Sequence, residues 1–244
     1  MFRLYDAATG RPEAVRSGRP GELRIWVTGP GAQPAGLRAC LVADLVRRVA
    51  QGHRLRVSVW QQAPGGDAGW PADGSAEDLR AAWDRLNIYP AEFSASPPDD
   101  LDVAVGQAGQ FAGAAALLLE PGEVAPEAPD VTGLDPLALR LAFLRHHYRD
   151  PAEASREALV DADQTLRRWR GLVADWASSP SKPMCAQYTG DVLGAFDDDL
   201  GSPAAVRTLD ALAADGDIPP GSKFEAFAYL DRLFGLDLAR DVGR

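Results

Sequence analysis

The stretch that decides the fold is LRIWVTGPGAQPAGLRACLVADLVRRVAQGHRLRVSVW, residues 23–60. Leu23–Thr28 and Leu55–Trp60 are rich in β-branched and aromatic residues, which predicts two strands. The segment between them carries apolar residues at helical spacing, namely Leu37, Leu41, Leu45 and Val49. Two parallel strands joined by a crossover helix satisfy this order best. Residues 20–61 therefore predict the opening of a doubly wound, Rossmann-like α/β sheet.

Ligands of such sheets bind beyond the carboxyl ends of the strands. In this chain those positions are Thr28–Gly36 and Gln61–Gly66. Ser75 is predicted to cap a helix with acidic residues in its first turn. Val103–Leu119 is apolar and rich in small residues, so it could form a strand, a helix or both. We expect either this segment or a second subunit to cover the free edge of the sheet, because bare edges invite unwanted pairing.

The pattern turns helical from Asp135, where an N-cap is followed by proline. The longest amphipathic stripe has a 3-4-3-4-3 spacing typical of a bundle seam and consists of Leu159, Ala162, Leu166, Trp169, Val173 and Trp176. Three further helices follow. We therefore predict an α/β domain over residues 1–133 and an all-α helical bundle domain over residues 134–244.

Composition bounds the possibilities. The 244 residues are 46% hydrophobic and 25% charged, which excludes a fully disordered chain. No apolar run is long enough to cross a membrane, and residues 1–10 lack the blocks of a signal peptide. The two cysteines, Cys40 and Cys185, cannot form a disulfide framework. The expected location is the cytoplasm.

The net charge of −10 is unevenly distributed. Residues 1–60 carry +6 as scattered arginines, whereas residues 181–244 carry −5. A general nucleic-acid binder usually has a basic excess, so tRNA is not the favoured partner. The basic residues comprise 23 arginines and two lysines, Lys182 and Lys223. The three aspartates Asp197–Asp199 are interpreted as solvated residues in front of a helix that begins at Ser202–Pro203.

Several segments, in order, resemble the cysteinyl-tRNA synthetases and the related cysteine ligases of mycothiol biosynthesis. They are FRLYDAATGRPEAV (2–15), IWVTGP (25–30), LRACLVADLVRRVAQGHRLRV (37–57), DPLALRLAFLRHHYRDP (135–151) and FDDDLGSPAAVRTLDAL (196–212). The resemblance implies a class I synthetase core in which much of the second half of the nucleotide-binding sheet is missing. It also implies an ancestry in cysteine activation with ATP, followed by transfer of the amino acid to tRNA or to an amine.

The resemblance implies a zinc ion that binds the substrate thiolate, with the cysteine of a "YVCGP" strand as its first ligand. Thr28 stands at that position, and a hydroxyl is a poor replacement for a thiolate. The remaining candidate ligands are Cys40, Cys185, His53, His146 and His147. We interpret these five as structural or surface residues, so we expect no zinc site.

Two further signatures of the family are replaced. The histidine-containing motif that contacts ATP phosphates aligns with Gln33, Pro34, Ala35 and Gly36. The lysine loop that stabilises the departing pyrophosphate aligns with residues 116–120, and residues 1–181 contain no lysine at all. Lys182 follows the HHYR segment instead of preceding it. Losing one charge-stabilising contact can cost about 10²–10³ in rate, so we expect no ATP site.

The leading hypothesis is therefore a synthetase-like paralog that has lost cysteine activation and acts as a binding or accessory protein for a small molecule or a protein. The alternative is a ligase or transferase that joins a cysteinyl or other aminoacyl group to a small amine or tRNA. A polar cleft near Thr28, Arg38 and Gln61 would favour the alternative. The candidate ligand-binding residues are Thr28, Gln33, Gly36, Arg38 and Gln61, and Arg38 matches an arginine that the family would use on an anion. We assign no catalytic and no metal-binding residue.

Overall fold

The computed structural model describes residues 2–29, 31–63, 75–107, 115–125 and 130–244. Its centre is a five-stranded parallel sheet in the order β5-β4-β3-β6-β7. The strands are β3 (Glu22–Val27), β4 (Arg56–Gln62), β5 (Glu92–Ser94), β6 (Val103–Val105) and β7 (Leu117–Leu119). The predicted parallel β-α-β unit is confirmed, with Leu23 opposite Val57 and Val27 opposite Gln61.

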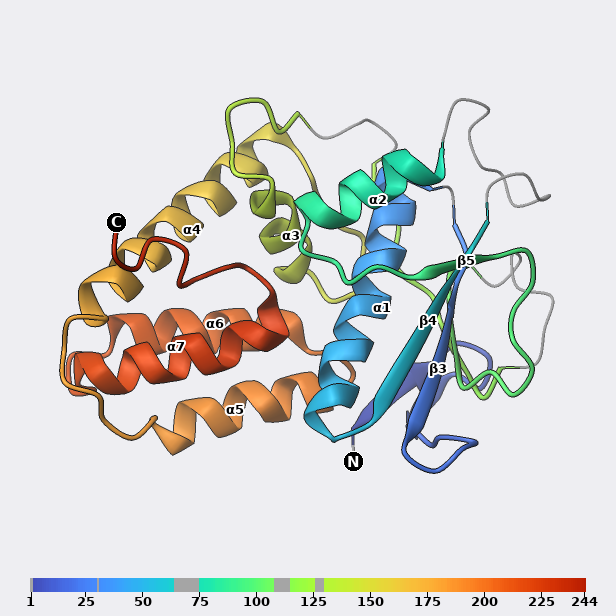
Figure 1. Ribbon diagram of the computed structural model, residues 1–244, viewed down its shortest axis with the longest axis horizontal. Coiled ribbons are helices and arrows are strands. Elements are labelled where there is room, and N and C mark those ends of the chain that lie inside the picture. The colour runs from blue at the N-terminus through green and yellow to red at the C-terminus, as the bar shows by residue number, and fades with distance from the viewer. Residues whose placement is uncertain (1, 30, 64–74, 108–114, 126–129) are drawn as a thin grey trace.

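Helix α1 (Pro34–Gly52) is the crossover between β3 and β4, and it is buried along most of its length. The helix lies between the strands on one side and α7 on the other (Figure 1). This position explains why its sequence carries apolar residues beyond the single stripe at Leu37, Leu41, Leu45 and Val49. A helix covered on two sides needs apolar residues around most of its circumference.

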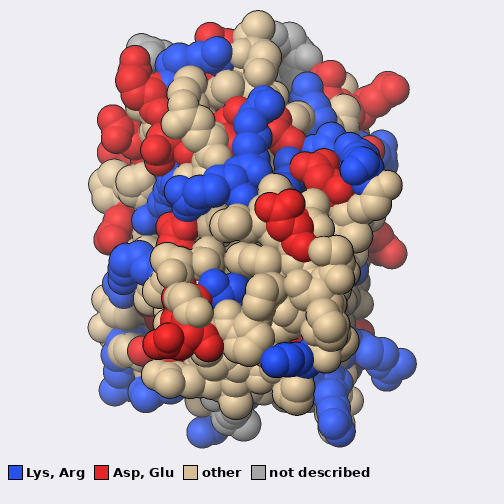
Figure 2. Space-filling view, turned by 90° about the vertical axis from the view of Figure 1, so that its left-hand side faces the viewer, with Lys and Arg blue, Asp and Glu red and all other residues tan. Residues whose placement is uncertain are grey.

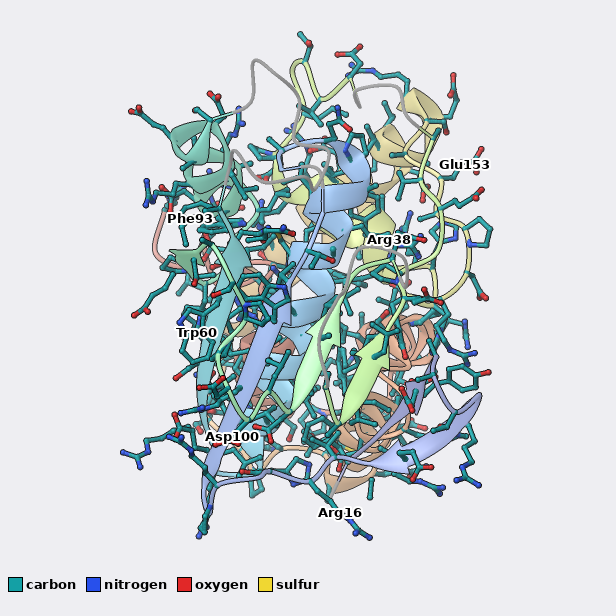
Figure 3. All side chains as sticks on the ribbon, turned by 90° about the vertical axis from the view of Figure 1, so that its right-hand side faces the viewer. Arg16, Arg38, Trp60, Phe93, Asp100 and Glu153 are labelled. Atoms are coloured by element: carbon teal, nitrogen blue, oxygen red, sulfur yellow. The ribbon has the colours of Figure 1, made fainter. Side chains whose placement is uncertain are left out.

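Helices cover one face of this sheet in the described part of the chain. Helix α2 (Ala76–Arg85) is capped by Ser75, as predicted, and the cap is a capping box in which Ser75 and Asp78 exchange hydrogen bonds. On the opposite face, which points at the viewer in Figure 3, no described helix crosses the strands. A small second cluster of Trp26, Leu101 and Ala104, with Trp60 packed against it, occupies that face.

The segment Val103–Leu119 covers the free edge of β3, which is one of the two arrangements that we expected. This segment contributes β6 and β7, and its residues 108–114 lie outside the described residues. Beside β7 lies a hairpin of β1 (Arg3–Asp6) and β2 (Arg11–Ala14). The Asp6 carboxylate accepts a hydrogen bond from the Leu118 amide, and the Ala7 amide donates to the Leu118 carbonyl. The second subunit stays a prediction.

The C-terminal part is helical, as expected. It comprises α3 (Leu137–Leu144), α4 (Arg156–Trp176), α5 (Ala186–Asp197), α6 (Ser202–Ala214) and α7 (Pro220–Phe234). All six residues of the predicted α4 stripe are buried. One continuous buried cluster includes residues from both sides of the predicted boundary at 133/134. That boundary stays a prediction. No helix among the described residues is both long enough and apolar enough to span a bilayer.

A buried ionic cluster joins the two parts. The carboxylate of Asp44, on α1, accepts hydrogen bonds from Arg48 Nε and Arg140 Nη2, each at 2.7 Å, and from the Tyr89 amide at 3.1 Å. Arg140, on α3, also donates to the carbonyls of Leu86 and Phe234. The side chains of Asp44 and Arg140 are completely buried. A buried carboxylate held by two guanidinium groups therefore ties α1 to α3 and to the end of α7.

Removal of the Asp44 carboxylate should be strongly destabilising. Asp44→Ala leaves two buried guanidinium groups without their counter-charge, which we expect to cost about 3–5 kcal/mol of the free energy of unfolding. Asp161→Ala is the control, since Asp161 forms an exposed ion pair with Arg145 and its loss should cost about 1 kcal/mol or less. Urea denaturation of both variants measures the difference, and equal losses would contradict a structural role for the Asp44 cluster.

Candidate functional site

A cleft of about 420 Å³ opens at the carboxyl ends of β3 and β6. These two neighbouring strands flank the point at which the strand order reverses, where ligands of open α/β sheets bind. The lining residues come from the ends of these strands, the first turns of α1 and the segment after β7: Thr28, Gly29, Ala35, Ala39, Gly106, Gln107, Pro121, Gly122, Glu123 and Val124. The position expected for ligands near Thr28–Gly36 thus coincides with a real cleft.

Glycines shape this cleft by letting backbone segments approach closely. A Cβ atom on Gly36 would lie 2.3 Å from the Gly31 carbonyl oxygen. A Cβ atom on Gly106 would lie 1.8 Å from Oγ1 of Thr28, and Gly106 also has a positive φ of 154°. Neither position has room for a side chain, so the first turn of α1 and the end of β6 are both held close to the end of β3.

The N-terminal end of α1 faces the cleft, because Ala35 and Ala39 form part of its wall. The N-cap residue Gln33 makes no side-chain hydrogen bond to the helix, and no acidic residue stands in the first turn. The backbone amides at a helix N-terminus carry partial positive charge. The start of α1 would therefore attract an anionic or strongly polar group of a ligand bound in the cleft.

Arg38 does not point into the cleft but supports its wall from behind. Its Nη1 donates to the carbonyls of Gly122 and Glu123, and its Nη2 donates to the carbonyl of His147. The residue is only 1% exposed, and Figure 3 shows it on α1, behind the strands. Burial lowers the pKa of Arg38 to about 10, and the nearby Asp150 acts in the opposite direction. A contact between Arg38 and an anion stays a prediction.

The other predicted ligand-binding residues do not all lie at the cleft. Thr28 is buried in its wall and donates a hydrogen bond to the Val105 carbonyl. Gln33, the N-cap of α1, is exposed and is not one of the described residues that line the cleft. Gln61 lies on a different side of α1, where its Oε1 accepts a hydrogen bond from Cys40 Sγ at 3.3 Å. Thr28 and Gly36 therefore help to build the cleft, Gln61 does not line it, and residues 64–66 lie outside the described residues.

The structure does not bring the five candidate metal ligands together. Cys40 is buried against Gln61, and His53 pairs with Asp197 at 2.7 Å. His147 Nε2 lies 2.9 Å from the Asp199 carbonyl, and Cys185 is the N-cap of α5. In the part of the chain that the structure describes, no three histidine, cysteine or acidic residues lie close enough to hold a metal ion. These residues do not fit the zinc site of the family.

The positions aligned with the lysine loop form strand β7. Leu117 and Leu119 are buried in the sheet, paired with Val103 and Val105 of β6. Lys223 donates to the Ala213 carbonyl in the helical part, and Lys182 lies next to the start of α7. Neither lysine lines the cleft.

The interpretation of Asp197–Asp199 as solvated residues is wrong for Asp199. Its carboxylate is 12% exposed and accepts hydrogen bonds from the Tyr5 amide and the Tyr148 hydroxyl, both at 2.7 Å, and from Arg149 Nε at 3.1 Å. Both Asp199 and Leu200 have positive φ angles, which turn the carboxylate back toward the β1–β2 hairpin. Sequence spacing gave no sign of this role, because all partners are distant in the chain.

The cleft also contains residues that the sequence analysis did not select, namely Gly106, Gln107 and Glu123. Gln107 Nε2 donates to the Pro121 carbonyl, and Glu123 presents an exposed carboxylate. Gly106 and Gln107 could have been predicted from the sequence, because they directly follow a short apolar strand. They were not, because Val103–Leu119 was treated as one segment and the end of that strand was not located.

Charge on the helical side of the molecule is mixed. Figure 2 shows basic and acidic side chains interspersed over the upper part of this face, and a lower part that is uncharged in its centre with separate charged side chains around it. A continuous basic surface of the kind that binds nucleic acid does not occur on the face shown. The expectation that tRNA is not the favoured partner remains a prediction.

Comparison with known proteins places these features in a family context. No family model matches the chain. It is similar to proteins named L-cysteine:1D-myo-inositol 2-amino-2-deoxy-alpha-D-glucopyranoside ligase. The protein from Thermomonospora curvata is 37% identical over 111 residues, which are 43% of this chain and 26% of the relative. The protein from Streptomyces coelicolor is 40% identical over 110 residues, with the same two shares.

A third relative, from Thermobispora bispora, is 42% identical over 84 residues, or 34% of this chain and 20% of the relative. The resemblance to the mycothiol cysteine ligases, which are class I synthetase-like proteins, is thereby confirmed over about 43% of the chain. The chain spans about a quarter of the length of the relatives it matches.

The close approach at Gly36 can be tested with two glycines of the same helix. Gly36→Ala forces a Cβ atom against backbone, so we expect a loss of about 1–3 kcal/mol in the free energy of unfolding. Gly52→Ala meets nothing within 4 Å and should be neutral or stabilising by up to about 1 kcal/mol. Chemical denaturation compares the two variants, and a neutral Gly36→Ala would rule out the tight contact.

The two cysteines should differ in reactivity. Burial raises the pKa of Cys40 to about 12, whereas Cys185 is partly exposed. The thiolate is the reactive form, so Cys40 stays unreactive at pH 8 and a second thiol appears only on unfolding. Iodoacetamide labelling followed by peptide mass spectrometry should find modification at Cys185 alone in the folded protein. Equal labelling of Cys40 would contradict its buried position.

Proposed function

We propose that this chain is a class I synthetase-like acyl-transfer protein that joins a cysteinyl or other aminoacyl group to a small amine. The observation that carries the proposal is the cleft at the strand-order reversal between β3 and β6, in a chain similar to cysteine ligases. The relatives' names describe the joining of L-cysteine to an amino sugar linked to inositol. An amine acceptor is therefore favoured over tRNA.

We further propose that the aminoacyl group arrives already activated. The positions aligned with the ATP-binding signature, Gln33–Gly36, offer no imidazole, and those aligned with the lysine loop form the buried strand β7. Thr28 offers a hydroxyl where the family resemblance implies a thiolate. These residues support uptake of an acyl donor more readily than its synthesis from ATP and cysteine.

The proposed reaction forms an amide bond. The acceptor ammonium first loses one proton to water, and the lone pair of the resulting amine attacks the acyl carbon. The carbon–oxygen bond to the activating group then breaks, and a second proton of the nitrogen leaves with the released oxygen. Several residues that line the cleft are glycine or alanine, which leave space for an aminoacyl ester or mixed anhydride at the N-terminal end of α1. That helix end would stabilise a negatively charged leaving group.

A second candidate function is a binding or accessory protein that takes up the same donor without transferring it. The observation that favours this candidate is the position of Arg38, whose guanidinium donates to three carbonyls. An arginine engaged in this way is a support for the cleft wall. The two candidates predict the same ligand and differ in whether an amide product appears.

Donor binding is tested with cysteinyl-sulfamoyl-adenosine, a stable analogue of an aminoacyl adenylate, in a thermal-shift measurement. Binding to the native state alone should stabilise it by about 2.7 kcal/mol at a hundredfold excess over the dissociation constant. Ala35→Leu places a large side chain in the cleft and should abolish the shift. The control Ala81→Leu makes the same change at an exposed position of α2 and should keep it.

Transfer is tested by incubating the chain with cysteinyl adenylate and glucosamine and measuring the amide by mass spectrometry. Product that depends on an intact Ala35 supports acyl transfer, whereas analogue binding without product supports the accessory role. Cysteine-dependent ATP–pyrophosphate exchange by the purified chain would show that it activates cysteine itself and would overturn the proposed use of a preformed donor.

A further inference from the structure

A second hollow, of about 290 Å³, lies next to the cleft at the switch between β3 and β6. It is lined by the β1–β2 hairpin, by the ends of β6 and β7 and by the turn after α3: Tyr5, Ala7, Gln107, Glu120, Pro121, Gly122, Glu123 and Arg149. Four of these residues, Gln107 and Pro121–Glu123, also line the cleft. The two cavities are therefore separated by one shared wall, which we call the 107/121–123 ridge.

The 107/121–123 ridge is rigidly held. Arg38 fixes the carbonyls of Gly122 and Glu123 from behind, and the Gly122 amide donates to the Tyr148 carbonyl at 2.7 Å. A Cβ atom on Gly122 would lie 2.3 Å from the Asp150 carbonyl oxygen, so the ridge packs directly on the turn after α3. Gln107 donates to the Pro121 carbonyl and ties the end of β6 to the same wall.

The charge of Arg149 in the hollow is already balanced. Its Nε and Nη2 lie 3.1 and 3.0 Å from Asp199 Oδ2, and its guanidinium carbon lies 4.1 Å from the centre of the Tyr5 ring. Nη1 makes no hydrogen bond to the described part of the chain. Arg149 is thus held flat over Tyr5, with one nitrogen able to donate to a ligand but without an unbalanced positive charge.

We propose that this hollow is the subsite for the acceptor, and that it takes a primary amine bearing hydroxyl groups. The proposal rests on the proposed acyl-transfer function. Arg149 is balanced by Asp199, whereas Glu123 lines both cavities and is exposed. A carboxylate binds an ammonium group through a charge-assisted hydrogen bond. Arg149 Nη1 and Gln107 Oε1 suit the hydroxyl groups.

The position of Glu123 would place the acceptor amine next to the donor. An amine held by the Glu123 carboxylate sits at the 107/121–123 ridge, on the border of the cavity proposed for the donor. Holding two reactants in contact converts a bimolecular step into an effectively unimolecular one. Glu123 is a positioning residue for the acceptor in this proposal, and no step of bond formation is assigned to it.

The experiment compares glucosamine with N-acetylglucosamine by isothermal titration calorimetry on the full chain, without any donor. Glucosamine should bind, and acetylation of its nitrogen, which removes the positive charge, should weaken binding at least about tenfold. Glu123→Gln should weaken glucosamine binding by a similar factor, as expected for the loss of a hydrogen bond to a charged group. Glu157→Gln, at an exposed position of α4, is the control and should leave binding unchanged.

Equal binding of the two sugars, or a Glu123→Gln variant that binds glucosamine normally, would overturn the subsite assignment. A thermal melt of Glu123→Gln confirms that it is folded, and the comparison of sugars tests the subsite without any variant. The outcomes are separable from those of the proposed function. Amide formation that is indifferent to Glu123 refutes the acceptor subsite alone, whereas selective amine binding without amide formation refutes acyl transfer alone.

Discussion

The buried contact between Asp44 and the two guanidinium groups of Arg48 and Arg140 is the constraint on which the arrangement of this molecule depends. Asp44 lies in the middle of α1, which is covered by the sheet on one side and by α7 on the other. Apolar contacts alone are non-directional and would tolerate a shift of one layer over the other. Because a buried carboxylate must keep its partners, the ionic cluster fixes how the helical part sits on α1.

The chain has few lysines, and its buried basic side chains are mostly arginines that donate hydrogen bonds to backbone carbonyls. Three buried arginines bridge several backbone carbonyls each, and the five donors of a planar guanidinium reach carbonyls farther apart than the compact ammonium of lysine does. Arg140 reaches Leu86 and Phe234, Arg170 reaches Leu236 and Asp237, and Arg38 reaches the residues of the cleft wall. Each of these contacts satisfies carbonyl oxygens where chain segments end, so arginine supplies directional contacts between segments that are far apart in the sequence.

The sequence allowed the local structure to be predicted well and the site only in part. The β-α-β unit, the Ser75 cap and the α4 stripe depend on residues close together in the chain, and all three are confirmed. The role of Asp199 could not be predicted, because its partners Tyr5 and Tyr148 are 194 and 51 residues away. Arg38 was predicted to contact an anion, which stays a prediction, and its observed partners are backbone carbonyls, which leave no trace in a sequence pattern.

The position of Arg38 changes which chemistry the cleft can offer. If its guanidinium faced the cleft, the site would present a fixed positive charge suited to phosphate groups. Instead it holds the wall that separates the cleft from the hollow beside the hairpin, and Glu123 is the charged residue of this wall. Because Arg38 lies behind the wall and Glu123 is part of it, the wall favours an amine over an anion. The anionic part of a donor is left to the amides at the start of α1. In the proposed acyl transfer, the anionic donor would therefore lie at the start of α1 and the amine at the 107/121–123 ridge.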